Sequence, residues 1–394
     1  MAAAFASIPS SVEALLAAAR EATGIDIVDE AAIEPLTIFR DSANRDGRLS
    51  PQGAVDIEKF LHRSLVNRLR MQRDLRRHPE ILEQKLLPPV IVCGVTRTGS
   101  TKTHKLLAAS GNFNWLPFWM SLNPALVSGD RAESPRPRIA DTEQFIAFYE
   151  QRAPEIRHIH ELVVDEPEEE TFSLTHSLRT PVLTGMVEAP GYIDWLMRGG
   201  VEPQFEFLAT VLRYLQWQGL ADPAKPWVLK SPFYSGLEGS LLNVFPGAHL
   251  VMTHRHPAVT VPSTCSLFSC FRKPYTEAGI DARAVLMGLA YPTQLHLQNR
   301  RKLPPHTFLD VHFRDIVADP AQVVQRIHRH GGLALTDTAL ANVMAWDRSN
   351  PQNKQGHHRY SLESYGLSGG QVEEAFKDYL QFLDETFPDH RGTT

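Results

Sequence analysis

Residues 90–111 read VIVCGVTRTGSTKTHKLLAASG, and this stretch decides the fold. The apolar run 90–93 is typical of a short buried strand, and Gly94 ends it. A turn of glycine, serine and threonine follows, and residues 101–109 have a helical pattern. The stretch therefore predicts a strand, a phosphate-type loop and a helix, in that order.

The loop from Gly94 to Thr101 has the glycine spacing of a Walker A motif, G-x-x-x-x-G-K-[ST], with one departure. Ser100 stands at the lysine position, and a cation lies earlier in the loop, at Arg97. Consecutive amides before a helix N-terminus form a positive cradle for phosphate oxygens even without that lysine. Because the lysine that reaches β- and γ-phosphates is missing, the loop suits a nucleotide with a single 5′-phosphate. A plain glycine-containing turn is the alternative interpretation.

Downstream of this unit, short apolar runs continue to alternate with helical patterns. The runs lie at residues 227–230, 249–253 and 307–313, and a helical pattern at 203–218 precedes them. Strands that alternate with helices indicate a mostly parallel sheet covered on both faces. The predicted fold class is therefore α/β, a P-loop-type three-layer α/β/α domain with a mostly parallel central sheet.

The part of the chain before this unit has a different character. Residues 10–85 have helical patterns throughout, and Leu87-Pro88-Pro89 separates them from the first strand. We expect an N-terminal helical extension over residues 1–86 and an α/β domain over residues 87–394. Within that domain, the polar and proline-rich stretch 128–141 predicts a loop or a boundary.

Composition narrows the class of protein. The 394 residues are 43% hydrophobic and 22% charged, which is typical of globular rather than disordered chains. Forty Lys+Arg against 45 Asp+Glu give a net charge of -5, which argues against a general nucleic-acid or heparin-type polyanion binder. Three cysteines are too few for a disulfide framework and favour a reducing cytosol. The oligomeric state stays open, with a homo-oligomer as one alternative.

The first residues look superficially like a secretory signal, but they lack a basic segment, and Pro9 and Glu13 interrupt the apolar stretch. Ser10 or Ser11 followed by an apolar pattern up to Gly24 predicts a capped amphipathic helix instead. No window reaches about 18 uninterrupted apolar residues, so no membrane span is predicted. We expect a cytoplasmic protein.

Four segments together resemble one family, the sulfotransferases. Loop 94–101 resembles the family's 5′-phosphosulfate loop, whose usual form is G-x-x-[RK]-[ST]-G-[ST]-T. Residues 227–232 read WVLKSP, similar to the family's strand ending in W-x-L-K-x-P, and residues 245–263 resemble its 3′-phosphate motif. Residues 354–367 resemble the loop that covers the cofactor in bacterial members. Each motif is weak alone, but four in the same order are specific.

This resemblance implies a sulfotransferase that uses 3′-phosphoadenosine 5′-phosphosulfate (PAPS), needs no metal, and releases PAP. It assigns the 3′-phosphate to Arg255 and Ser263. An arginine fork after a strand, with a serine on the helix opened by Pro257, is also physically suited to a phosphate monoester. The predicted cofactor-binding residues are Arg97, Thr98, Gly99, Ser100, Thr101, Arg255, Ser263, Phe313, Lys354, His358 and Arg359.

Lys230 and Arg97 are predicted to act in catalysis. Lys230 ends an apolar strand, which places its ammonium at the carboxyl edge of the sheet, where open α/β sheets bind ligands. A cation there stabilises the oxygen between the phosphate and the departing sulfuryl group, where charge grows in the transition state. Arg97 would contact the phosphosulfate in the same manner. A structural salt bridge is the alternative role for Lys230.

The acceptor side departs from the family pattern. Many bacterial and tyrosyl-protein sulfotransferases carry a glutamate base after the loop's arginine, but here Met120 stands in that neighbourhood. Trp115, Phe118, Trp119 and Met120 fall in the segment that lines the acceptor pocket of related enzymes, so the resemblance implies that they line one here. Aromatic walls suit a flat or lipid-like hydroxyl compound. Ordinary core packing is the alternative.

Replacement bases are available at His160, in the sequence HIHE, and at Glu169, in the acidic run DEPEEE at 165–170. Histidine titrates near neutral pH, whereas a glutamate needs partial burial to raise its pKa. A solvated helix start is the alternative for the run, and HIHE lacks a third ligand, so no metal is predicted. We therefore expect either that His160 or Glu169 is required or that the acceptor is a phenol-like hydroxyl.

Two rival functions follow from the same residues. A P-loop small-molecule kinase would use the same loop, but Ser100 at the lysine position argues against it. A PAPS- or PAP-binding protein that has lost catalysis is motivated by Met120.

Overall fold

The computed structural model describes residues 5–351 and 360–390. In these residues four strands form one parallel sheet in the order β2-β1-β3-β4. They are β1 (Val90–Cys93), β2 (Val228–Lys230), β3 (His249–His254) and β4 (Phe308–His312). Each agrees with its predicted run to within one residue at either end, which confirms the mostly parallel α/β sheet.

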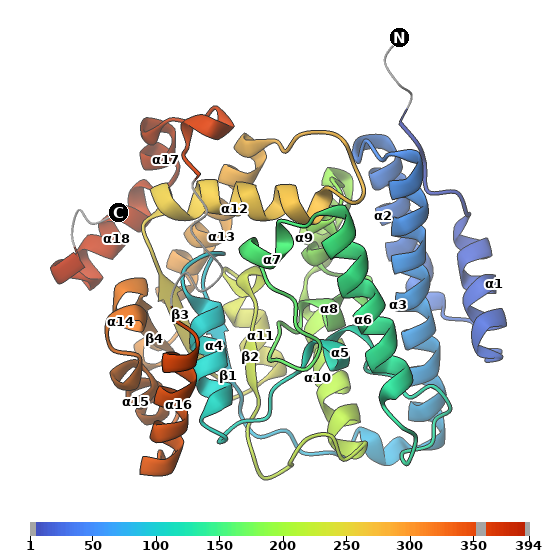
Figure 1. Cartoon of the computed structure of the whole chain (residues 1–394), viewed down its shortest axis with the longest axis horizontal. Coiled ribbons are helices and arrows are strands. Elements are labelled where there is room, and N and C mark those ends of the chain that lie inside the picture. Colours follow the sequence, from blue (N-terminus) through green and yellow to red (C-terminus); the bar gives the residue numbers. More distant parts are fainter. Residues whose placement is uncertain (1–4, 352–359, 391–394) are drawn as a thin grey trace.

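Alternate residues of β1 enter two different hydrophobic clusters, which is the reason that the strand is apolar throughout. Val90 and Val92 pack with α4 (Ser100–Ala109), α15 (Pro320–His330) and α16 (Asp337–Ser349). Ile91 and Cys93 pack on the other face with α10 (Glu202–Trp217) and α11 (Glu238–Val244). Helices therefore cover both faces of the sheet, and the three-layer arrangement is visible in Figure 1.

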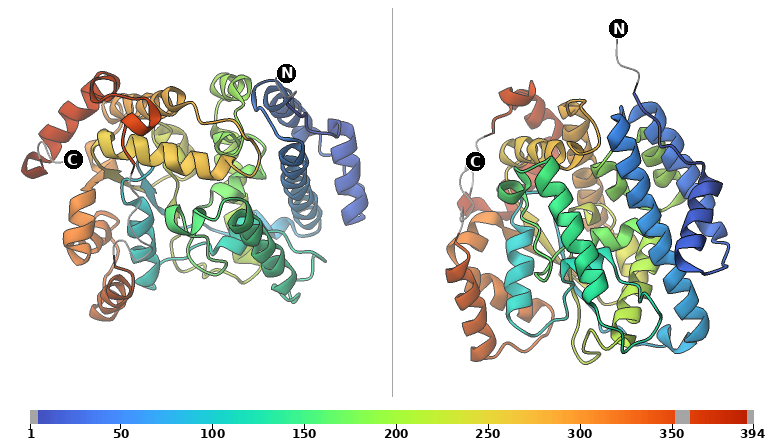
Figure 2. Two further views of the ribbon diagram at one scale, coloured as in Figure 1. Left: turned by 45° about the horizontal axis from the view of Figure 1, so that its top comes forward. Right: turned by 45° about the vertical axis from the view of Figure 1, so that its right-hand side comes forward.

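The predicted N-terminal extension consists of α1 (Val12–Thr23), α2 (Glu30–Asp46) and α3 (Pro51–Arg77). Ser11 caps α1 by accepting a hydrogen bond from the Ala14 amide, and Gly24 ends the helix with a φ of 64°. The three helices share a hydrophobic cluster with α6 (Arg136–Arg152), α9 (Pro190–Gly199) and α12 (Pro257–Arg272). The extension therefore packs on the rest of the chain along one side (Figure 2).

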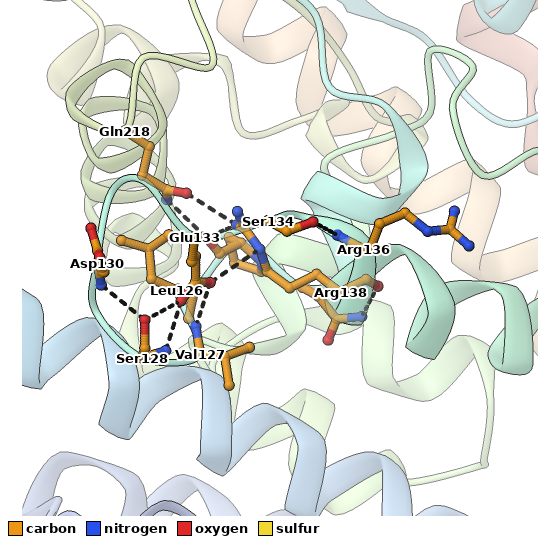
Figure 3. A network of polar contacts seen from close by, with 12 residues as sticks. Leu126, Val127, Ser128, Asp130, Glu133, Ser134, Arg136, Arg138 and Gln218 are labelled. Atoms are coloured by element: carbon orange, nitrogen blue, oxygen red, sulfur yellow. Dashed lines mark hydrogen bonds and ion pairs between the residues drawn. The ribbon is translucent and has the colours of Figure 1, made fainter.

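The proline-rich stretch predicted as a loop or boundary is a tight turn followed directly by α6. The Glu133 carboxylate accepts hydrogen bonds from the amides of Val127 and Ser128, both at 2.7 Å. Arg138 on α6 donates to the Gln218 side chain at 3.0 Å (Figure 3). Side-chain oxygens thus satisfy the turn's amides, and α6 begins inside the predicted loop.

The remaining helices connect these layers. They are α5 (Phe118–Leu122), α7 (Ile156–Ile159), α8 (Thr171–Thr175), α13 (Ala282–Arg300), α14 (Phe313–Ala318), α17 (Gly369–Ala375) and α18 (Lys377–Thr386), with 3-10 turns at Pro79–Ile81, Pro181–Gly185, Pro232–Tyr234, Pro305–Thr307, Glu363–Tyr365 and Pro388–His390. In the described part of the chain, no helix combines the length and hydropathy that crossing a bilayer requires.

Candidate active site

A cavity of about 520 Å³ opens at the carboxyl edge of the sheet, above the N-terminus of α4. Its lining comes from the loop after β1, the segments around α7 and α8, α12, α14 and α16. Parallel strands bring their carboxyl ends to one edge, so residues far apart in sequence converge here.

The loop between β1 and α4 requires both of its glycines. Gly94 has a φ of 125°, and a Cβ there would lie 2.5 Å from the carbonyl oxygen of Thr253. Gly99 has a φ of 92° and contacts Phe313 and Ile316 of α14 so closely that a Cβ would lie 3.0 Å from each. The loop is therefore held in a shape that presents backbone amides at the start of a helix.

Among the predicted loop residues, Arg97, Gly99, Ser100 and Thr101 line the cavity. The Thr98 side chain does not reach it. This hydroxyl is buried, donates to the Val95 carbonyl at 2.8 Å, and lies 2.6 Å from the Thr253 hydroxyl. The Thr98 side chain therefore ties the loop to β3.

Arg97 and Arg255 place two guanidinium groups beside this loop. Arg97 has a φ of 70°, and its side chain donates to the Ser263 hydroxyl at 2.9 Å and to the Ile159 carbonyl at 3.1 Å. Arg255 donates to the Arg97 carbonyl at 3.3 Å and stacks over the Phe313 ring at 3.9 Å. Four predicted cofactor residues thus come together, with Ser263 buried behind Arg97.

The electrostatics of this pair favour an anion. Burial is the largest cause that lowers the pKa of Arg255, and the nearby charge of Arg97 adds to it. Within residues 5–351 and 360–390, neither guanidinium pairs with a carboxylate. Two partly buried cations without counter-charge are unfavourable unless an anion lies between them.

Lys230 ends β2 as predicted, and its side chain is only 1% exposed. The ammonium donates to the Thr101 hydroxyl at 3.1 Å and forms an ion pair with Glu169. It therefore lies between the first turn of α4 and the acidic run, directly at the loop.

The acidic run is not a solvated helix start, because four of its five carboxylates have specific partners and only Asp165 is exposed without one among the described residues. Glu166 pairs with Lys105 at 2.7 Å, and Glu168 lies 3.3 Å from His160. Glu170 accepts from the Tyr234 hydroxyl at 2.6 Å and the Lys230 amide at 2.9 Å. Burial raises the pKa of the Glu170 carboxyl to about 7. The run therefore connects three parts of the site, and α8 begins only after it.

His160, Glu168 and Glu169 all line the cavity. Burial alone would raise the pKa of Glu168, but the charge of His160 and its hydrogen bond outweigh burial and hold that pKa well below its usual range. Of the two predicted bases, His160 therefore has a carboxylate partner, whereas Glu169 is occupied by a cation.

The apolar half of the cavity differs from the predicted acceptor pocket. Its wall consists of Phe172 on α8, Val182 and Met186, and Leu267, Phe268 and Phe271 on α12. The α12 aromatics are not among the residues predicted from the sequence, because an apolar helix face gives the same pattern whether it lines a cavity or a core.

Trp115, Phe118, Trp119 and Met120 do not line the cavity. Phe118 is fully buried and packs edge-on against Phe172, with ring centroids 4.9 Å apart. Trp119 and Met120 belong to the cluster beneath the sheet, and Trp115 packs against the opposite cluster. The alternative of core packing therefore describes these four side chains, and the predicted acceptor contact is corrected.

Three predicted cofactor residues, Lys354, His358 and Arg359, lie outside the described residues. Pro351 and Tyr360, on either side of them in sequence, line the cavity, as does Trp346 on α16. Trp346 is not among the residues predicted from the sequence.

A separate charged cluster lies behind Arg255. Ligand atoms of His254, His296 and Asp310 lie within 4.8 Å of one another, and Arg300 forms two hydrogen bonds of 2.8 Å with Asp310. The Asp310 charge is therefore already balanced by a guanidinium. The cluster fixes the end of β3, from which Arg255 emerges, to β4 and α13.

Comparison with known proteins agrees with this geometry. A family model described as "Sulfotransferase family" matches residues 88–337, which include the loop, Lys230, Arg255 and the acidic run. The omega-hydroxy-beta-dihydromenaquinone-9 sulfotransferase Stf3 of Mycobacterium bovis is 25% identical over 292 residues, covering 71% of this chain and 72% of that protein. The protein of the same name from Mycobacterium tuberculosis matches equally.

Two solved structures are similar over nearly the whole chain. Sulfotransferase STF9 from Mycobacterium avium has a TM-score of 0.82 at 23% identity, covering 95% of this chain and 97% of that one. Sulfotransferase STF1 from Mycobacterium tuberculosis has a TM-score of 0.78 at 28% identity, covering 95% and 100%. The predicted fold class is thereby confirmed, including the N-terminal helices.

Proposed function

Because this chain belongs to the sulfotransferase family, we propose that it moves a sulfuryl group from PAPS to a hydroxyl of a small lipid-like acceptor and releases PAP. The observation that carries the donor assignment is the pair Arg97 and Arg255, which lack carboxylate partners within the described residues and lie at an amide cradle. A nucleotide with phosphates at both its 3′ and 5′ positions supplies the missing negative charge.

Each group at the sheet edge has a role in this reaction. The amides from residue 98 to 101 and Arg97 bind the 5′-phosphosulfate, and Arg255 binds the 3′-phosphate. Ser263 is buried and acts on the donor only through Arg97, whose guanidinium donates to its hydroxyl. Lys230 is buried next to Thr101 and does not line the cavity itself; in the proposed reaction its ammonium stabilises, from behind Thr101, the oxygen that takes up charge when the bond to sulfur breaks.

The acceptor proposal rests on the apolar wall of Phe172, Phe268 and Phe271, which suits an apolar molecule that carries one reactive hydroxyl. It also rests on Stf3, whose name describes a hydroxylated menaquinone derivative as its substrate. His160 is the proposed general base, since it lies between this wall and the carboxylate of Glu168.

The catalytically impaired alternative is less well supported. It was motivated by Met120, but that side chain lies in the core, whereas His160, Glu168 and Glu169 line the cavity. Turnover of PAPS with a hydroxylated lipid, followed as PAP release, separates an enzyme from a binding protein.

PAP should bind without any metal, and Arg255→Ala should weaken this binding by about 2–3 kcal/mol, or roughly 30- to 160-fold, the scale of a hydrogen bond to a charged group. Calorimetry with PAP measures the change. Arg136→Ala is the matched control, because Arg136 is exposed and, among the described residues, its side chain pairs only with Glu143 at 3.7 Å. Equal PAP affinity in the two variants would overturn the donor assignment.

EDTA should leave the turnover of PAPS unchanged, because Ser100 replaces the lysine that accompanies a Mg²⁺-bound triphosphate chain in P-loop enzymes. The test compares PAP release with and without EDTA, and ATP with Mg²⁺ is titrated in parallel. A strict requirement for Mg²⁺ together with ATP binding would favour the rival kinase.

A further inference from the structure

The His160 side chain is held between an aromatic ring and a carboxylate and is largely shielded from solvent. His160 follows α7, and its ring lies 5.7 Å from that of Phe271 in the apolar wall. Its Nε2 lies 3.3 Å from Oε2 of Glu168, and the two side chains are 13% and 6% exposed. Nδ1 has no hydrogen-bond partner within residues 5–351 and 360–390, so it is free to accept a proton.

The Glu168 carboxylate is itself held in one orientation. Its Oε1 accepts a hydrogen bond from the Glu169 amide at 2.8 Å, which leaves Oε2 for His160. The Glu168 amide donates to the Leu116 carbonyl at 2.9 Å, and Pro167 pairs with Pro117 in an isolated bridge. The backbone at Glu168 and just before it is therefore tied to the segment before α5.

We propose that Glu168 is a positioning residue that holds His160 with its proton on Nε2, so that the lone pair of Nδ1 is presented to the acceptor hydroxyl. This inference rests on the proposed function. A carboxylate that accepts from one ring nitrogen fixes which nitrogen is basic and stabilises the imidazolium that forms.

These positions account for each bond and proton that changes in the proposed transfer step. The acceptor oxygen forms a bond to sulfur while the bond from sulfur to the 5′-phosphate oxygen breaks, and that electron pair stays on PAP, whose charge Lys230 stabilises. The acceptor's proton passes to Nδ1 of His160, and the imidazolium pairs with Glu168 until the proton leaves to water. Glu169 cannot replace Glu168 here, because its carboxylate is paired with Lys230.

The alternative role for Glu168 is purely structural, as the anchor of the acidic run. The two roles differ in pH dependence. If Glu168 supports the imidazolium, Glu168→Gln should lower kcat by about 10- to 100-fold and move the acidic limb of the kcat/KM profile to lower pH. The affinity for PAP should stay within about twofold, because Glu168 does not touch the predicted donor residues.

Glu166→Gln is the matched control, since it removes a carboxylate from the same run but one that pairs with Lys105. It should leave the acidic limb and kcat unchanged. An unchanged acidic limb in Glu168→Gln would overturn the proposal, whatever happens to kcat. If the wild-type chain does not bind PAP, the proposed function is overturned instead. Failure of the Glu168 proposal and failure of the proposed function therefore give different results.

A measurement on the wild-type chain covers the case in which Glu168→Gln does not fold. Imidazole ¹⁵N shifts, assigned to His160 by the loss of its signals in His160→Ala, report which nitrogen carries the proton above the histidine's titration. We expect the Nε2–H tautomer. A predominant Nδ1–H tautomer would overturn the proposal.

Discussion

Lys230→Met should lower kcat by about 10²- to 10³-fold, the scale of losing one preorganised donor to a developing oxyanion. The ammonium lies at the end of β2, is almost fully buried, and is fixed by Thr101 and Glu169. Methionine keeps most of the side chain's volume but removes the ammonium, with its charge and its hydrogen bond to Thr101. The apparent affinity for PAPS should change much less, since its bridging oxygen carries little charge before the bond to sulfur breaks.

Removing one partner of a buried ion pair also leaves the other unpaired, and this effect needs a control. The double variant Lys230→Met/Glu169→Gln removes both charges and should recover thermal stability without recovering kcat. Recovery of kcat in the double variant would mean that Lys230 serves only to neutralise Glu169. A wild-type kcat in Lys230→Met would contradict the catalytic role altogether.

The loop and strand ends at this edge of the sheet could be predicted because their determinants are local. The strand, glycine turn and helix at 90–109 follow from periodicity and glycine spacing, and they fix where amides point. Lys230 is placed by a single rule, that parallel strands share a carboxyl edge. Neither step needs knowledge of tertiary packing.

The acceptor side could not be predicted in the same way, because adjacent residues in an extended segment point in different directions. Glu168, Glu169 and Glu170 are consecutive, yet they contact His160, Lys230 and Tyr234 respectively. Composition reports only that three carboxylates occur together. Their partners come from a loop, a strand and a turn that the sequence does not place.

The aromatic residues illustrate the same limit. Trp119 is predicted to line an apolar wall and Phe271 is not, yet only Phe271 lines the cavity. α5 lies behind α8, with Phe118 against Phe172, so its side chains fill the core. Which of two apolar helices faces a cavity depends on how they stack, and stacking is not encoded in the periodicity of either helix.

His160→Ala should lower kcat by about 10²- to 10⁴-fold with an aliphatic alcohol as acceptor, the range of general base catalysis. The loss should be much smaller with a phenol, because a phenol has a pKa near 10 rather than about 16 and needs less help to lose its proton. PAP release measures both rates, and PAP affinity, followed in parallel, should stay near the wild-type value.

Glu169→Gln gives the contrasting result if His160 is the base. The carboxylate of Glu169 pairs with Lys230, so its removal leaves the proton acceptor intact and reduces the negative charge beside the donor site. We therefore expect kcat within a few-fold of wild type and unchanged or tighter PAP binding in this variant.

The opposite pattern, with kcat lost in Glu169→Gln and retained in His160→Ala, would make Glu169 the base and require Lys230 to release it when the donor binds. Retention of kcat with an aliphatic alcohol in both variants would contradict the acceptor-side assignment and leave the donor side unaffected, because neither side chain belongs to the cluster of Arg97, Arg255 and Phe313.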